Sequence, residues 1–145
     1  MEEYWGATKE AVIENIGKPE ETQTNEETGL EELTYVFTAK QDFQPVKEVT
    51  YGFNQNSLVI ISTGYDFNEK LFKQYELYHK SLEEDWTKRI GAEPVKPTEK
   101  DDQNNIITVW NVSNSEILLY FNNDAANPQL IVVQTYKPAN LFDML

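Results

Sequence analysis

The hydrophobic positions between residues 71 and 90 recur at steps of three and four. They are Leu71, Tyr75, Tyr78, Leu82, Trp86 and Ile90. This spacing places the six side chains on one face of an α-helix, which predicts a long amphipathic helix with a buried stripe. Asp66 and Glu69 have capping-box spacing at its start, and Gly91 and Pro94 follow its end.

A shorter stripe lies near the N-terminus, at Val12, Ile13 and Ile16. Thr8 is a favourable N-cap residue for this helix. Gly17 and Pro19 end it in the way that glycine and proline end the longer helix. The pattern predicts two helices of different length with the same kind of exit.

A polar loop and then strand-like segments follow each helix. Three pairs of segments match between the two halves: "LTYVFTA" (33–39) with "ITVWNVS" (107–113), "VTYGFNQN" (49–56) with "ILLYFNND" (117–124), and "LVIIST" (58–63) with "LIVVQT" (130–135). Asn-rich turns between the last two strands of each half indicate antiparallel hairpins. We therefore predict an α+β fold of two tandem αβββ repeats, residues 1–66 and 67–138, with both helices on one face of an antiparallel sheet. The C-terminal tail, residues 139–145, lies beyond the repeats and together with Pro138 reads "PANLFDML".

The segments "WGATKEAVIENIGKPE", "LTYVF" and "VTYGFNQNSLVIISTGYDF" resemble an uncharacterised bacterial family, and "IGAEP", "VWNV" and "ILLYF" repeat the pattern. In shape, this pattern is similar to the β-lactamase-inhibitor-protein-like (BLIP-like) group, which includes the small lipoprotein of the outer-membrane assembly machine. The resemblance implies a tandem helix-plus-sheet fold that binds proteins, in a group whose members are often exported or lipid-anchored. No contact residue of such an inhibitor matches this sequence.

The composition narrows the classes of function. The net charge is −13, which argues against binding nucleic acid through its phosphates and against adsorption to anionic lipid. The longest apolar runs are far shorter than the roughly 20 residues of a membrane helix. No secretory leader follows Met1, which fits either a cytoplasmic protein or an exported one whose leader lies outside this sequence; the resemblance favours export or the cell surface.

The residues that could carry chemistry do not form a catalytic pattern. His79 is the only histidine and flanks the buried stripe of the long helix. Glu83, Glu84 and Asp85 are adjacent, so their side chains point in different directions. The segment 101–105 lacks the glycine and the distal glutamate of a calcium loop. We expect no enzyme activity, no cofactor and no metal.

The alternation of side chains along the predicted strands indicates which residues lie on the exposed face of the sheet. Because side chains alternate between the faces of a strand, one face of the first two strands in each half is the richer in apolar residues and is assigned to the core. This core set is Leu33, Tyr35, Phe37, Val49, Tyr51 and Phe53, with Ile107, Val109, Asn111, Ile117, Leu119 and Phe121 in the second half. The opposite face carries Trp110, Leu118 and Tyr120, with Val36 in the first half, and we expect these four to form an exposed partner-binding patch.

The leading hypothesis is a non-catalytic protein-binding module that acts through this open face on a protein of unknown identity. The alternative for the patch is that Trp110 and Tyr120 pack under a loop or the tail. A further hypothesis is that the chain forms a homodimer through this face. The alternative function is an intracellular acidic inhibitor or nucleic-acid mimic, of phage origin, which the −13 charge suggests.

Overall fold

The computed structural model describes residues 5–39, 44–67, 72–100, 105–112, 114–122 and 128–137, with residues 72 and 96–100 described by their backbone alone. The elements, in chain order, are α1 (Lys9–Ile16), β1 (Glu21–Thr24), β2 (Glu31–Phe37), β3 (Val46–Asn54), β4 (Ser57–Asp66), α2 (Phe72–Ile90), β5 (Lys96–Lys100), β6 (Asn105–Val112), β7 (Ser115–Asn122) and β8 (Gln129–Tyr136).

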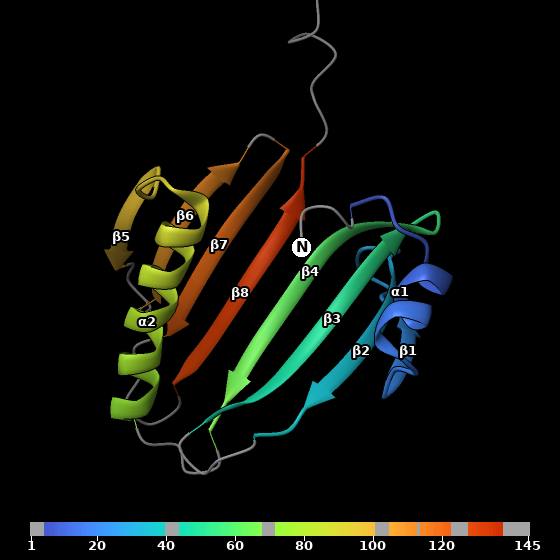
Figure 1. Cartoon of the computed structure of the whole chain (residues 1–145), viewed down its shortest axis with the longest axis horizontal. Helices are drawn as coiled ribbons and strands as arrows, with labels where there is room; N and C mark the ends of the chain where they lie inside the picture. The colour runs from blue at the N-terminus through green and yellow to red at the C-terminus, as the bar shows by residue number, and fades with distance from the viewer. Residues whose placement is uncertain are drawn as a thin grey trace, which may run out of the picture.

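The strands form one eight-stranded sheet in the order β1-β2-β3-β4-β8-β7-β6-β5 (Figure 1). Every pair of neighbours is antiparallel, as the hairpin signals predicted. Each half of the chain is a meander of consecutive strands. The halves join where β4 pairs with β8, so the last strand of each half lies at the centre of the sheet.

The prediction of two tandem αβββ repeats, and with it the BLIP-like fold class, is wrong. The molecule is mostly sheet, and each helix is followed by four strands instead of three. The additional strands, β1 and β5, lie in segments that were predicted to be polar loops. All four side chains of β1 are exposed, so the strand has no apolar alternation that could reveal it. Its pairing with β2 comes from backbone hydrogen bonds, which carry no side-chain pattern.

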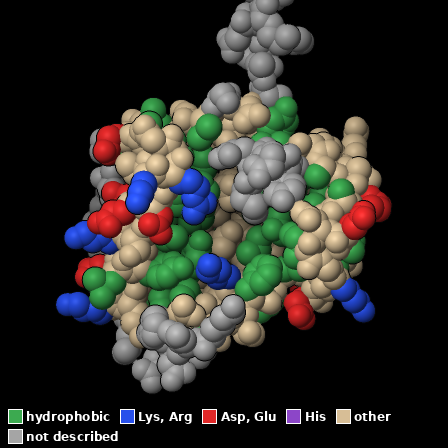
Figure 2. Space-filling view, in the orientation of Figure 1, with side chains coloured by type: hydrophobic (Ala, Val, Ile, Leu, Met, Phe, Trp, Pro, Cys, Tyr) green, Lys and Arg blue, Asp and Glu red, His purple; other side chains and the backbone are tan. Residues whose placement is uncertain are grey.

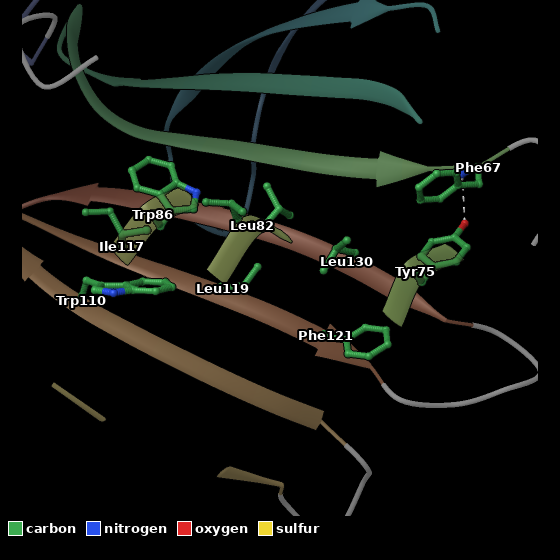
Figure 3. Close-up of a cluster of buried hydrophobic side chains, with 10 residues drawn as sticks. Phe67, Tyr75, Leu82, Trp86, Trp110, Ile117, Leu119, Phe121 and Leu130 are labelled. Atoms are coloured by element: carbon green, nitrogen blue, oxygen red, sulfur yellow. Dashed lines mark hydrogen bonds between the residues drawn. The ribbon is translucent and has the colours of Figure 1, made fainter. Parts of the chain in front are cut away.

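Both helices lie on one face of the sheet, which we call the helix side. One cluster of buried residues joins α2 to the second half of the sheet (Figure 3): Phe67, Tyr75, Leu82, Trp86, Trp110, Ile117, Leu119, Phe121, Leu130 and Val132. A second cluster joins Val12 of α1 to β2, β3 and β4: Leu33, Tyr35, Val49, Tyr51, Phe53, Leu58 and Ile61. Ile61 pairs with Gln134 and Thr63 with Val132, so these two clusters share the same face.

Local sequence accounts for how the first half begins and turns. The Thr8 hydroxyl accepts a hydrogen bond from the Ala11 backbone N–H at 3.1 Å, which caps α1 as predicted. Gly17 ends the helix with a φ of 113°, in a region that favours glycine. Gln55 and Asn56 both have positive φ, which is the requirement of a two-residue type I′ hairpin turn between β3 and β4.

The predicted stripe of the long helix is confirmed. Tyr75, Leu82 and Trp86 are buried, while Tyr78 and Ile90 pack against the same cluster. The predicted cap is not formed by Asp66, because this residue ends β4 and its carboxylate accepts a hydrogen bond from the Tyr75 hydroxyl at 2.9 Å. Leu71 and Glu69 lie outside the described residues.

Candidate surface on the open face of the sheet

The face of the sheet opposite the helices, which we call the open face, changes character at its middle. One row across six strands reads Thr34, Thr50 and Ser62 in the first half, and then Val133, Leu118 and Val109 in the second. The next row reads Val36, Glu48 and Gly64, and then Ile131, Tyr120 and Ile107. The first half of this face is therefore largely polar, and the second half is apolar.

Six neighbouring side chains of the second half form what we call the apolar patch: Ile107, Val109, Leu118, Tyr120, Ile131 and Val133. All six are half-buried. They lie on β6, β7 and β8, and no helix or strand among the described residues packs over them. Sheet spacings of about 4.8 Å between strands and about 6.8 Å between alternate residues give the patch a footprint on the order of 200 Å².

Trp110 was predicted to be exposed in this patch, and that placement is wrong. The side chain is only 1% exposed and packs under α2 on the helix side (Figure 3). Its indole N–H donates a hydrogen bond to the Thr87 hydroxyl of α2 at 3.3 Å. Trp110 pairs with Ile117, as Tyr35 pairs with Val49, so Tyr35 and Trp110 are equivalent core positions.

The error has a physical cause in strand register. The sequence alignment of the two halves matched Tyr35 with Val109, one residue away from the equivalence that the sheet shows. Since side chains alternate along a strand, a slip of one residue moves every side chain to the opposite face. Ile107, Val109 and Asn111 were consequently assigned to the core, whereas they lie on the open face.

Leu118 and Tyr120 do lie on the open face. The Tyr120 hydroxyl donates a hydrogen bond to the Asn105 side-chain oxygen at 2.6 Å, which fixes the ring against the sheet. Val36 is 41% exposed on the same face, but it lies on β2, separated from the apolar patch by Glu48 and Gly64. The structure thus brings two of the four predicted residues together.

Four residues of the patch were missed: Ile107, Val109, Ile131 and Val133. A signal for two of them was present in "VWNVSNSEILLYF". A two-residue turn at residues 113–114 requires Val112 to pair with Ser115, which the structure shows. That pairing puts Trp110 beside Ile117 and puts Val109 beside Leu118.

Charged groups border the patch without entering it. Glu116, in the next row of the open face, forms an ion pair with Lys137 at 2.8 Å. Asn111 beside it is exposed. An uncharged centre with a polar border is the composition of a protein–protein contact surface.

The titratable side chains that the sequence singled out include His79 and Glu83, which lie on α2. His79 is half-buried on α2 and stacks on Phe121 with 4.8 Å between ring centroids, so it flanks the core as the sequence indicated. Burial lowers its pKa, and the carboxylate of Glu83, 3.9 Å away, opposes this only in part. Among the residues that the structure describes, no group of three His, Asp or Glu could hold a metal ion. The segment 101–104 lies outside them.

Comparison with known proteins bears on the fold. No family model matches the chain, and no curated protein matches it. A solved structure does: the crystal structure of YjgB, a DUF4309 family protein from Bacillus subtilis subsp. subtilis strain 168. The TM-score is 0.50 at 14% sequence identity, with 90% of this chain and 78% of that chain covered.

This likeness concerns the fold alone. It supports the resemblance to an uncharacterised bacterial family, whereas the resemblance to the BLIP-like group is not confirmed. Within the described part of the chain, neither helix has the length and apolar composition needed to cross a membrane.

Proposed function

We propose that the chain is a non-catalytic protein-binding module that uses the apolar patch as the centre of its contact surface. The observation that carries the proposal is the change from polar to apolar side chains along single rows of the open face. In its first half the sheet forms with polar residues at the positions that match Leu118 and Val133, which are Thr50 and Ser62. The apolar residues at Leu118 and Val133 are therefore not required for the sheet to form, and an interface accounts for them.

The size of the patch limits what the contact looks like. A stable protein–protein interface buries about 800 Å² on each partner, several times the footprint of the patch. The partner must therefore extend beyond the patch onto its border, towards Glu116 and Lys137 or towards the Thr and Ser side chains of the first half. The apolar centre supplies most of the binding energy, and the polar border supplies orientation.

Two substitutions test this proposal with little risk to the fold. Leu118→Thr and Val133→Ser each place on the second half a residue that the first half already carries at the matching position, Thr50 or Ser62. A partner isolated with the wild-type protein, identified and produced separately, should bind each variant about tenfold or more weakly by calorimetry, since tenfold corresponds to about 1.4 kcal/mol. Leu77→Ser, at a 57% exposed leucine of α2, is the matched control.

Equal affinity of wild-type protein and both open-face variants for that partner contradicts the proposal. Loss of binding in the Leu77→Ser control contradicts it too, because it places the contact on α2. Sedimentation of each protein alone at several concentrations shows whether the partner is a second copy of the chain.

A further inference from the structure

The helix side of the sheet contains a groove that neither helix covers. It runs between α2 and the far ends of β2 and β3, and its volume is about 860 Å³. Residues of three neighbouring strands form its floor: Lys47, Val49, Thr63, Tyr65, Val132 and Gln134. We call it the central groove. Figure 2 shows hydrophobic side chains on both sides of the middle of this face, with basic side chains between them.

Aromatic side chains line the central groove. Tyr78 and Trp86 of α2 form one wall, and Phe37 of β2 lies on the other, where it is 43% exposed. The rings of Tyr65 and Tyr78 lie 5.2 Å apart, and the Arg89 guanidinium carbon lies 4.4 Å above the Trp86 ring. Such a surface binds apolar and aromatic side chains.

The charge of the central groove is opposite to that of the whole chain. The protein carries −13, yet the described lining holds Lys47 and Arg89 against the single acid Asp85. Burial raises the pKa of Tyr65 to about 12, so its hydroxyl stays protonated and can donate a hydrogen bond. The groove therefore suits a segment that combines apolar side chains with one carboxylate.

We propose that the chain's own segment 138–145, "PANLFDML", binds in the central groove. This segment lies outside the described residues, and it has the composition that the groove requires: Leu141, Phe142 and Met144 are apolar and surround one acid, Asp143. Its aromatic and aliphatic side chains pack on the aromatic walls, and its carboxylate lies towards Arg89 and Lys47. The groove is then a self-binding site that a competing acidic and aromatic peptide has to displace.

The point where the segment leaves the sheet favours this placement. It follows β8, whose residues Val132 and Gln134 form part of the floor. Tyr136, at the end of β8, stacks on Trp5 with 5.8 Å between ring centroids. The Trp5 indole N–H is buried and has no hydrogen-bond partner among the described residues. A chain that turns back over Tyr136 brings a backbone carbonyl to this donor.

The length of the segment is sufficient. Eight extended residues span roughly 26 Å. The path along β8 from Tyr136 back to the level of Tyr65, which pairs with Leu130, covers six residues and about 20 Å. Because only four residues separate β8 from Leu141, the local concentration of the segment at its own groove is in the millimolar range, which favours binding within one molecule over binding to a second copy.

A spin label tests the proposal on the full chain. The sequence contains no cysteine, so Leu145→Cys gives one labelling site without touching the four residues that bind. If the segment lies in the central groove, the label should remove most of the intensity of the backbone amide signals of Lys47, Tyr65 and Tyr78. Phe142→Ser in the labelled protein should restore these signals. Arg89→Gln should restore them in part, and Lys88→Gln, its exposed neighbour outside the groove, should not.

A mixture of spin-labelled protein with isotope-labelled protein that lacks the spin label distinguishes binding within one molecule from binding to a second copy. Signal loss in the sample whose molecules carry both the spin label and the isotope label, with none in the mixture, supports the proposal. Signal loss in the mixture overturns it, because the segment then lies in the groove of a second copy. Full intensity at Lys47, Tyr65 and Tyr78 in both samples also overturns it, because the groove is then not occupied by the segment.

Discussion

Replacing Trp110 by alanine tests the register that separates the core from the open face. The side chain is 1% exposed, and an indole buries roughly 200 Å², worth about 5 kcal/mol at about 25 cal/mol per Å². The methyl group of alanine retains part of this, and measured losses for such truncations are about 3–5 kcal/mol. The lost hydrogen bond to Thr87 adds little, because Thr87 is half-exposed and its hydroxyl can bind water instead. We expect the free energy of unfolding to fall by about 4 kcal/mol.

Equilibrium unfolding in urea, followed by circular dichroism, measures this change without relying on tryptophan fluorescence. Leu118→Ala on the open face is the comparison, and we expect it to cost about 1 kcal/mol, since a half-buried leucine loses about half of its burial energy. A loss of less than about 1 kcal/mol for Trp110→Ala refutes the assignment of Trp110 to the core. So does a Leu118→Ala variant that is less stable than Trp110→Ala.

Two further predictions concern a titration and a close contact. The pKa of His79 is lowered by burial, so the unfolded chain binds more protons and stability should fall as the pH drops through about 6.5. Urea unfolding at about pH 7.5 and about pH 5 should show a larger loss for wild-type protein than for His79→Gln; equal losses contradict the assignment. Gly52→Ala should cost about 1–3 kcal/mol, because the added Cβ would lie 2.4 Å from Ile60 Cγ2. Gly64→Ala, where the nearest atom is 4.0 Å away, should cost less in the same assay.

The local features of the fold could be predicted from the sequence. The Thr8 cap, the exit at Gly17 and the stripe through Leu82 and Trp86 all depend on residues within a few turns of one another. The hairpin turn at residues 55–56 is local too, since it needs two residues that accept positive φ. Each of these signals is contained in a short stretch of chain.

The edge strands and the register of the halves could not be predicted in the same way. β1 has four exposed side chains and pairs with β2 along its backbone, so its own residues carry no apolar signal. A search for matching letters between halves aligned Tyr35 with Val109, although cross-strand pairing makes Trp110 its equivalent. The similarity between the segments of the two halves was visible in the sequence, but the one-residue offset between the matching strands was not.

The one-residue offset explains which residues of the candidate surface were predicted correctly and which were not. Leu118 and Tyr120 were placed on the correct face because they were assigned by alternation within one strand. Trp110 was placed with them by alternation within another strand, whereas in the structure it pairs with Ile117 and lies on the helix side. The pairing of Val112 with Ser115 places Val109, in place of Trp110, beside Leu118 on the open face, and the surface remains.

Site-specific photo-crosslinking tests the claim that the apolar patch is the contact surface most directly. A benzophenone amino acid at position 118, in the centre of the patch, is compared with the same group at position 50, its counterpart in the first half of the open face. In the native host, we predict a crosslink from position 118 to one discrete protein, identified by mass spectrometry, and none from position 50. A crosslink to that protein of equal yield from position 50, or no crosslink from position 118, contradicts the claim.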